Sequence, residues 1–393
     1  MIVFLGWASA PTLGAEYVIH ISVDGLNDSI LQSLIDAGEA PNFKRFEDEG
    51  AWTLNGRTDY SETVTLPNHT TMLTGRPVFR PTGLPNAPFH NWTENSSPQK
   101  RATLHKDGYI PSVFDVVHDA GLSTALYASK DKFAIFDQSY DETNGAPSAR
   151  GRDKIDKFLA ADDGPPRYSQ GLNERFVEEM AAQHYHYAFV HYRDPDSAGH
   201  ATRWGSSTYR QAVHGVDGYL GDVFRFVETD PQLKGKTAII LTADHGGWAL
   251  GHDDPAVREN YTIPIFAWGA GVAHGDLYAM NGQSRMEPGE ARVDYAIDKQ
   301  PIRNGDTGNL ALSLLGLGPI PTSLIDAAQD LRVAIPGDYN LDGTVDAADE
   351  VVWRNAKDST TDLRADGNRD GRVDEADYEL WKANFGQTAN AAK

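Results

Sequence analysis

The sequence predicts an α/β fold, with a central, mostly parallel sheet flanked by helices. A small helical unit is expected at the C-terminal end of the chain. Three short apolar runs, rich in β-branched residues, each end just before an acidic residue or a turn that carries one. Such runs are typical of buried strands whose carboxyl ends bear polar side chains. The 393 residues, 37 of them glycine, leave room for one large α/β domain with many tight turns and a short additional unit.

The predicted strands bring acidic and imidazole side chains to one edge of the sheet. The strands are expected at Tyr17–Val23, Tyr187–Tyr192 and Thr237–Thr242. In the same order, they are followed by Asp24, by Asp196 with His200, and by Asp244, His245 and His252. Open α/β sheets bind ligands outside the carboxyl ends of their strands, so we expect these side chains to converge on one crevice.

A fourth segment, from Thr65 to Gly75, predicts a helix with a hydroxyl group at its start. Pro67 lies near the beginning of this helix and Gly75 at its end, which are common positions for the two residue types. Unpaired backbone N–H groups at the amino terminus of a helix favour an anion such as a phosphoryl group. A threonine hydroxyl becomes a nucleophile when a divalent metal helps to remove its proton, so Thr65 is expected to be both metal ligand and nucleophile.

The residue types indicate a two-metal centre. Asp and His together suit zinc or a similar transition metal, whereas magnesium and calcium prefer shells of oxygen. Two such ions roughly 4 Å apart can clamp the attacking and leaving oxygens of an in-line displacement at phosphorus. The ligands predicted for one ion are Asp24, Thr65, Asp244 and His245. Those predicted for the other are Asp196, His200 and His252.

These four motifs, in this order, resemble the nucleotide pyrophosphatase/phosphodiesterase branch of the alkaline phosphatase superfamily. The resemblance covers most of residues 16–335 and rests on Val-Asp24-Gly, Thr65-Leu-Pro-Asn-His, Pro-Asp196-Ser-Ala-Gly-His200 and Ala-Asp244-His245-Gly. It implies an alkaline-phosphatase-like domain with two zinc ions, which hydrolyses phosphodiester or pyrophosphate bonds of a nucleotide-like substrate through a covalent phospho-threonyl intermediate. It also implies an asparagine that holds a phosphoryl oxygen, at Asn86 or, alternatively, at Asn91.

The chain departs from the eukaryotic members of this branch in two ways. Their last histidine ligand lies far downstream of the Asp-His-Gly motif, whereas Gly251-His252-Asp253 follows it closely here, as in bacterial relatives; His274 is the alternative ligand. No match is found for the residues that grip a nucleotide base, so the leaving group stays open.

Four alternative functions remain open. The same centre suits a phosphomonoesterase or a hydrolase of a phosphonate such as phosphonoacetate. Sulfate ester hydrolysis is disfavoured, because the sulfatase branch has Cys or Ser where Thr65 stands. A noncatalytic cell-surface module that only holds metal is the fourth alternative.

Other conspicuous side chains have a structural interpretation. Alternation along a strand points neighbouring side chains to opposite faces, so four histidines are expected to pack in or beside strands without a chemical role: His20, His184, His186 and His191. Two tryptophans near the motifs, Trp204 and Trp248, are at most candidates for pocket walls.

Two acidic loops near the C-terminus indicate calcium. They begin at Asp338 and Asp366, 28 residues apart, and each places oxygen-bearing residues at positions one, three, five, seven, nine and twelve with Gly at position six. The expected ligands include Asp338, Asn340, Asp342, Thr344 and Asp349 in the first loop, and Asp366, Asn368, Asp370, Arg372 and Asp377 in the second. Asp replaces the usual closing Glu, so residues 336–388 resemble a dockerin module. That resemblance implies two calcium ions and a cohesin-like protein partner.

Composition favours an exported protein that does not bind nucleic acid. A formal charge of −21 argues against DNA and anionic membrane surfaces as partners, and the absence of cysteine excludes disulfides and thiolate zinc ligands. Residues 1–15 form an apolar run ending in small residues, which resembles the later part of a truncated signal peptide and is too short for a membrane span. We therefore expect a secreted, periplasmic or cell-surface protein.

Overall fold

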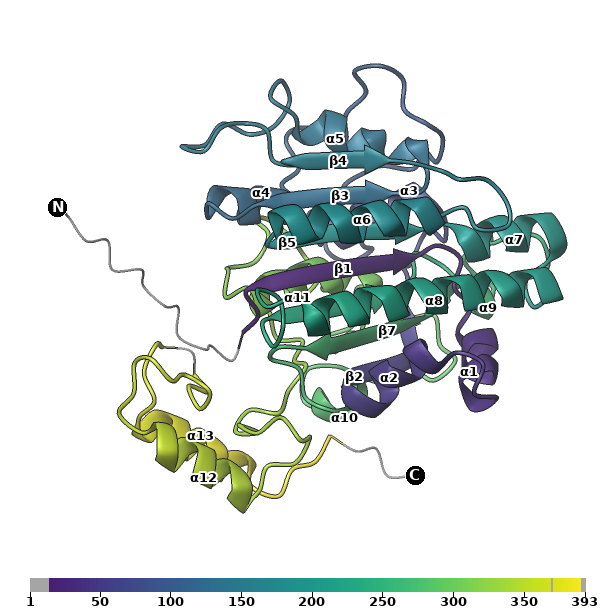
Figure 1. Cartoon of the computed structure of the whole chain (residues 1–393). Coiled ribbons are helices and arrows are strands. Elements are labelled where there is room, and N and C mark those ends of the chain that lie inside the picture. Colours follow the sequence, from purple (N-terminus) through teal and green to yellow (C-terminus); the bar gives the residue numbers. More distant parts are fainter. Residues whose placement is uncertain (1–13, 369, 390–393) are drawn as a thin grey trace.

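The computed structural model describes residues 14–368 and 370–389 (Figure 1). Its centre is one eight-stranded sheet in the order β4-β3-β5-β1-β6-β7-β2-β8. The strands are β1 (Tyr17–Val23), β2 (Ala51–Arg57), β3 (Thr124–Ala128), β4 (Lys157–Ala160), β5 (Tyr187–Tyr192), β6 (Thr237–Thr242), β7 (Thr262–Gly269) and β8 (Gly275–Asp276).

The three predicted strands, β1, β5 and β6, have the predicted bounds and lie side by side in the middle of the sheet. All neighbours from β4 to β6 are parallel, so their carboxyl ends meet at one edge. Only β7 runs antiparallel to its neighbours β6 and β2. The prediction of a mostly parallel sheet is therefore confirmed.

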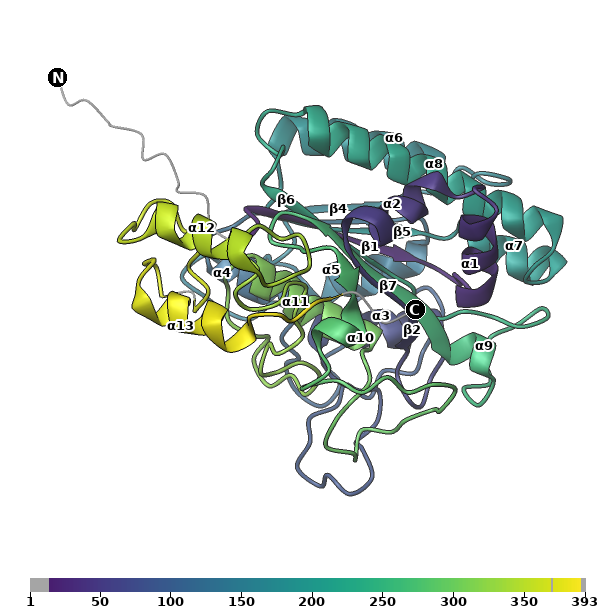
Figure 2. The same cartoon turned by 90° about the horizontal axis from the view of Figure 1, so that it is seen from below.

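Helices cover both faces of the sheet (Figures 1 and 2). One face packs against α1 (Asp28–Asp36), α2 (Pro41–Glu49), α6 (Gln170–Gln183) and α8 (Ser207–Thr229). The other packs against α3 (Thr65–Thr74), α4 (Val113–Asp119), α5 (Ala134–Tyr140) and α11 (Thr307–Leu314). Within β1, Ile19 and Ile21 lie in the first core and Val18 in the second, as alternation along a strand requires.

Helix α3 begins at Thr65, as predicted, and every one of its side chains is buried. Gly75 ends the helix in the left-handed conformation, with a φ of 61°, and its N–H donates to the carbonyl of Thr71. Glycine adopts this conformation without the steric cost of a side chain, which explains the sharp stop. The helix is thereby fixed beneath the centre of the sheet with its amino terminus near the carboxyl ends of the strands.

The remaining short elements join these layers or lie at their ends. They are α7 (Asp194–Thr202), α9 (Arg258–Tyr261), α10 (Leu277–Met280) and the 3₁₀ turns η1 (Asp131–Phe133) and η2 (Asn304–Asp306). No helix within residues 14–368 and 370–389 has the length and apolar character needed to cross a membrane. Most of the predicted signal peptide, residues 1–13, lies outside the described residues.

The two acidic loops each lead into a helix, α12 (Ala347–Ala356) and α13 (Glu375–Asn384). The loops and helices form a small core of their own, made of Tyr339, Trp353, Ala356, Ala365 and Val373, with Tyr378 and Trp381 of α13 packed against it. This C-terminal helix pair also joins the large domain, because Val345 and Ala389 are buried in the core beneath the sheet. The N–H of Asp276 in β8 donates to the carbonyl of Ala389 at 2.8 Å, so the end of the described chain covers one edge of the sheet.

Candidate active site

Seven side chains of the predicted metal centre gather at the carboxyl edge of β5, β1 and β6. Six are buried, and the exception is His200, whose side chain is 46% exposed. They follow the ends of β1 and β6, lie in α7 after β5, or stand at the start of α3: Asp24, Thr65, Asp196, His200, Asp244, His245 and His252. The carbonyl of Thr63, two residues before α3, accepts a hydrogen bond from Nδ1 of His252 at 2.6 Å, which ties this helix to the ligands.

Asp24, Asp244 and His245 form the first group of candidate ligands. Nε2 of His245 lies 3.5 Å from Oδ1 of Asp24 and 3.3 Å from Oδ2 of Asp244. A tetrahedral zinc ion with bonds of about 2.0 Å separates its ligand atoms by about 3.3 Å. The first group therefore has the spacing of one metal site.

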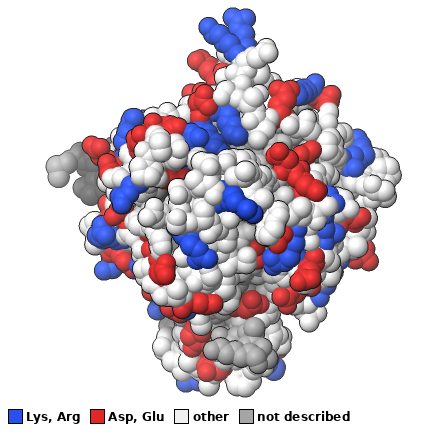
Figure 3. Space-filling view, turned by 90° about the vertical axis from the view of Figure 1, so that its right-hand side faces the viewer, with Lys and Arg blue, Asp and Glu red and all other residues white. Residues whose placement is uncertain are grey.

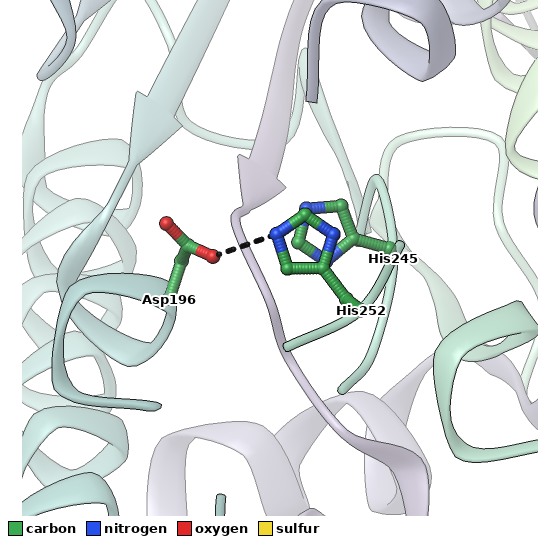
Figure 4. Close-up of side chains that lie close together, drawn as sticks. All are labelled: Asp196, His245 and His252. Atoms are coloured by element: carbon green, nitrogen blue, oxygen red, sulfur yellow. Dashed lines mark ion pairs between the residues drawn. The ribbon is translucent and has the colours of Figure 1, made fainter. Parts of the chain in front are cut away.

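Asp196, His200 and His252 form the second group. Oδ1 of Asp196 lies 3.3 Å from Nε2 of His200 and 3.5 Å from Nε2 of His252, and the two nitrogens are 3.1 Å apart. The ring of His245 stacks on that of His252 with centroids 3.6 Å apart, so the two groups adjoin (Figure 4). His245 also lies close enough to Asp196 and His252 to share one ion with them, so the division of the ligands between two ions stays a prediction.

Each carboxylate of the centre has one anchored oxygen and one free oxygen. Oδ2 of Asp24 and Oδ2 of Asp196 accept from Nζ of Lys130 at 2.6 and 2.7 Å. Oδ1 of Asp244 accepts from the N–H of Gly25 at 3.1 Å. The opposite oxygens, which face the imidazoles, have no hydrogen-bond partner although they are buried. Buried polar atoms are nearly always paired, so these free oxygens fit a bound cation.

The three imidazoles present the same nitrogen to the centre. Nδ1 of His200, His245 and His252 lies within hydrogen-bond distance of a backbone carbonyl, at 3.0, 2.9 and 2.6 Å respectively. A hydrogen on Nδ1 leaves the lone pair on Nε2, which is the usual arrangement around a metal. His69 differs, because both of its nitrogens have partners, Ser22 and Thr65, and it is not available as a ligand.

The electrostatics agree with this arrangement. Burial alone would raise the pKa of Asp24, but the ammonium of Lys130 and the ring of His191 outweigh burial and hold that pKa well below its usual value. Burial, with the charge of Asp24 beside it, raises the pKa of Asp244 well above its usual value. Burial lowers the pKa of His252 to about 3, so its ring is neutral at neutral pH. One ammonium therefore does not balance three carboxylates, and further positive charge suits the site.

A sequence model of the type I phosphodiesterase/nucleotide pyrophosphatase family matches residues 18–309. The chain belongs to this family. The matched stretch contains all seven side chains of the candidate centre, together with the strands and the helix that position them. Members of such a family are enzymes of phosphoryl transfer.

The curated relatives of this phosphodiesterase-family protein include GPI ethanolamine phosphate transferases. The mouse GPI ethanolamine phosphate transferase 1 is 23% identical over 335 residues, covering 79% of this chain and 32% of the mouse protein. The Aspergillus oryzae protein of the same name is 28% identical over 150 residues, covering 36% of this chain and 14% of the fungal protein. The chain thus spans less than a third of the length of these relatives.

Solved structures of the alkaline phosphatase superfamily share the fold. Inactive murine ectonucleotide pyrophosphatase/phosphodiesterase 5 in complex with AMP has a TM-score of 0.52 at 14% identity, covering 80% of this chain and 99% of that structure. An alkaline phosphatase superfamily protein from Vibrio parahaemolyticus has a TM-score of 0.51 at 15% identity, covering 83% and 75%.

Among the described residues, neither Asn86 nor Asn91 is hydrogen-bonded to the start of α3. Asn86 is exposed and lines a separate cavity with Arg76, which follows the carboxyl end of α3. Thr65 lies at the amino end of this 10-residue helix. At the usual rise per residue, the two ends of the helix are about 15 Å apart. Asn91 is also exposed and donates to Asp107. Asn95 is exposed as well, but its Oδ1 accepts from the N–H of Leu66 at 3.0 Å, directly beside Thr65.

The alternative ligand His274 is not part of the centre. Its Nε2 lies 3.1 Å from the carbonyl of Glu47, and its own carbonyl lies beside Gly343 of the first acidic loop. His252 is the histidine that reaches the second group, so the compact spacing of the motif is the one that the fold uses.

Three residues beside the centre were not predicted. His191 was expected to have no chemical role, but its Nε2 lies 2.9 Å from Oδ2 of Asp24. Lys130 and Lys132 follow β3, whose carboxyl end lies at the same edge of the sheet. Nζ of Lys132 donates to Oδ1 of Asn95 at 3.0 Å. A search for basic as well as acidic side chains after predicted strands would have found both lysines.

Proposed function

We propose that this protein is a metal-dependent hydrolase of phosphodiester or pyrophosphate bonds, with Thr65 as its nucleophile. The observation that carries the proposal is the pair of adjoining ligand groups with unpartnered oxygens, beside a helix that begins at a threonine. Asp24, Thr65, Asp244 and His245 would hold one divalent ion, and Asp196, His200 and His252 the other. Zinc is the ion that this mixture of carboxylate and imidazole suits.

Two bound ions would supply charge that lowers the pKa of the Thr65 hydroxyl and balances the charge of the phosphoryl oxygens. The hydroxyl oxygen of Thr65 attacks phosphorus as it gives up its proton to solvent, and the bond to the leaving oxygen breaks on the opposite side, where that oxygen takes up a proton from solvent. The product is a phospho-threonyl ester. Water then attacks the same phosphorus, which restores the Thr65 hydroxyl and releases a phosphomonoester.

Groups at the amino terminus of α3 are suited to hold the phosphoryl oxygens. The N–H of Leu66 donates to Oδ1 of Asn95, so at this helix start it is the positive end of the helix dipole, near Thr65, that stabilises negative charge. The side chain of Asn95 lies beside Leu66, and Lys132 lies beside Asn95. We assign to Asn95 the role predicted for Asn86, with the Lys132 ammonium as a second donor. Burial and the neighbouring Lys130 lower the pKa of Lys132 to about 8, which still leaves it mainly protonated at neutral pH.

The transferase relatives suggest a second candidate. Their names describe transfer of ethanolamine phosphate, and the mouse protein aligns with 79% of this chain. Transfer and hydrolysis share the first half-reaction, and an alcohol in place of water would receive the phosphoryl group from Thr65. The structural neighbour that binds AMP supports the nucleotide-like substrate instead, and its inactive form carries alanine in place of a threonine. Phosphomonoester and phosphonate substrates suit the same pair of ligand groups.

We further propose that the acidic loops bind two calcium ions and that the protein acts outside the cytoplasm. In the first loop, Asp338 and Asp349 are buried, and burial together with the charge of Asp349 raises the pKa of Asp338 to about 7. Gly343 and Gly371 at position six have φ of 84° and 89°, the left-handed turn that such loops require. Crowded carboxylates on an oxygen-rich loop suit calcium, and the dockerin-like spacing suggests a cohesin-like partner.

The first experiment compares hydrolysis of bis-p-nitrophenyl phosphate and p-nitrophenyl phosphate by the parent chain, with zinc and with chelator. We expect zinc-dependent preference for the diester. Thr65→Ala should lower the rate by at least about a thousandfold, because removal of a catalytic nucleophile costs several orders of magnitude in kcat. Thr70→Ala is the matched control, since its hydroxyl donates only to the carbonyl of Leu66 in the same helix.

Activity of Thr65→Ala near that of the parent would contradict the assignment of the nucleophile. Preference for the monoester would instead favour the phosphatase alternative. Added ethanolamine or another alcohol separates hydrolysis from transfer, because a transferase would form the alkyl phosphodiester at the expense of the phosphomonoester.

A further inference from the structure

This inference rests on the proposed function. That function determines on which side of the site the leaving group departs. An in-line displacement places the leaving oxygen opposite the attacking oxygen. With Thr65 assigned to the group of Asp24 and Asp244, the leaving group departs toward the group of Asp196, His200 and His252. The part of the surface next to this second group therefore meets the leaving group.

A tight loop, Trp248 to Gly251, borders the second group. It connects His245 to His252 and is closed by two hydrogen bonds between Trp248 and Gly251, at 2.9 and 3.0 Å. The carbonyl of Leu250, in the middle of the loop, lies 3.0 Å from Nδ1 of the ligand His200. The loop is thus part of the same rigid structure as the ligands.

Trp248 and Leu250 expose large apolar surfaces at this position. Trp248 is 57% exposed and Leu250 55%, and they are two of only six large hydrophobic side chains exposed in the described part of the chain. Figure 3 views the carboxyl edge of the strands, where basic and acidic side chains alternate around a largely uncharged surface. Scattered apolar residues are normal on a surface, but two on one four-residue loop beside a candidate active site are not scattered.

The packing beneath the loop prevents these side chains from moving inward. The ring of Trp204 fills the space below, and its Nε1 donates to the carbonyl of Gly25 at 2.9 Å. A Cβ atom on Gly199 or Gly247 would lie only 2.6 or 2.0 Å from this ring, so the backbone already contacts it. Ala249 holds a φ of 55°, unusual for alanine, and its carbonyl accepts from the N–H of Trp204 at 3.0 Å. The backbone conformation of the loop and the Trp204 ring beneath it therefore keep Trp248 and Leu250 exposed.

We propose that Trp248 and Leu250 form an apolar ledge that binds a ring-bearing leaving group. The face of a tryptophan ring stacks on planar rings. Leu250, two residues after Trp248 on the same loop, would extend the apolar contact. This assigns to the leaving group a class of chemistry, an aryl or heteroaryl alcohol, that the metal-binding groups themselves do not specify. Both side chains act through binding of the departing group and take no part in the bond changes at phosphorus.

The test compares two phosphodiesters with leaving groups of similar acidity, methyl 4-cyanophenyl phosphate and methyl 4-methylumbelliferyl phosphate. The second leaving group has an additional fused ring. We expect the parent to prefer the two-ring ester in kcat/KM by roughly tenfold, the order that burial of one more ring face gives. Trp248→Ala should remove most of this preference and Leu250→Ala part of it. Phe385→Ala is the matched control, since Phe385 is also 57% exposed but lies in the C-terminal helix pair.

A preference for the two-ring ester that survives in Trp248→Ala would overturn the ledge. If Trp248→Ala keeps the preference for the two-ring ester but binds phosphatidylcholine vesicles more weakly than the parent, the ledge is also overturned. That result would indicate a lipid surface as the ligand. Equilibrium binding of 4-methylumbelliferone to Thr65→Ala, with and without Trp248→Ala, tests the ledge without turnover. If the parent hydrolyses neither ester but Trp248 still governs binding of the ring, the proposed function fails and the ledge stands.

Discussion

Lys130 shows how much of the candidate centre depends on a single side chain. Its ammonium contacts one oxygen of Asp24 and one of Asp196, so it holds carboxylates from both ligand groups. The contacts fix each carboxylate with its other oxygen turned to the imidazoles. Burial would lower the pKa of Lys130, but the two carboxylates outweigh burial and raise it, so the ammonium stays charged.

We expect Lys130→Met to lower the free energy of unfolding of the metal-free protein by about 3 kcal/mol, because it leaves buried carboxylates without a partner. Bound zinc should restore much of this loss, since it supplies positive charge to the same carboxylates. Urea unfolding with zinc and with chelator measures both effects. Lys132→Met is the matched control, because Lys132 contacts Asn95 and no carboxylate. An equal loss in zinc and in chelator would contradict this role of Lys130.

At the scale of single elements, local sequence signals predicted the parts of the fold that position the ligands. The bounds of β1, β5 and β6 and the start of α3 agree with the prediction. The strand ends are marked by apolar runs that stop within two residues of an aspartate. The bounds of α3 are marked by Pro67 near its start and Gly75 at its end. The ligand positions follow directly, because they are adjacent in sequence to the ends of these elements.

The residues that support the ligands could not be predicted in this way. Asn95 reaches α3 through a long irregular connection after Gly75, and sequence distance from Thr65 pointed to Asn86 instead. His191 lies inside β5, where alternation gives its face of the sheet but not the partner that it meets there. These contacts depend on how connections and layers pack, and such packing leaves no local signal.

The two acidic loops also show that equal sequence positions can have unequal roles. Position eight is valine in both, and both side chains are fully buried. Val373 belongs to the core of the C-terminal helix pair, whereas Val345 belongs to the core beneath the large sheet. The first loop therefore inserts a side chain into the core of the large domain, whereas the second does not.

We expect Val345→Ala to weaken this junction by about 2 kcal/mol, the usual order for a buried aliphatic truncation. The amide of Asp276, which donates to Ala389, should then exchange its hydrogen roughly 30-fold faster. Val373→Ala, at the same loop position, should leave that exchange almost unchanged. Hydrogen exchange of the two variants in calcium is the measurement, and equal acceleration in both would show that the helix pair docks as one unit.

For the whole molecule, buried imidazoles make stability depend on pH. Burial holds the pKa of His90 at about 3, and its ring joins Thr71 of α3 to the N–H of Trp92. The unfolded chain binds a proton at this residue below about pH 6.5, whereas the folded chain does not. The contribution of neutral His90 to the free energy of unfolding is therefore fully present above that pH. It is lost as the pH falls toward 3.

A comparison with His90→Gln isolates this effect, because glutamine does not titrate and can still donate to Thr71. We expect the stability advantage of the parent to shrink by up to about 1.4 kcal/mol per pH unit between pH 6 and pH 4. Urea unfolding of both proteins across this range gives the difference directly. A difference that stays constant with pH would show that His90 is already protonated in the folded chain.

The junction between β8 and the end of the described chain also bears on where the protein can be cut. A chain ended at residue 335 would keep every predicted ligand of the two-metal centre, yet it would lose Val345 from the core and the backbone partner of Asp276. Uncovered edge strands invite pairing with other molecules. We therefore expect a chain shortened at residue 335 to aggregate because its sheet edge is uncovered, while the arrangement of its candidate metal ligands stays intact.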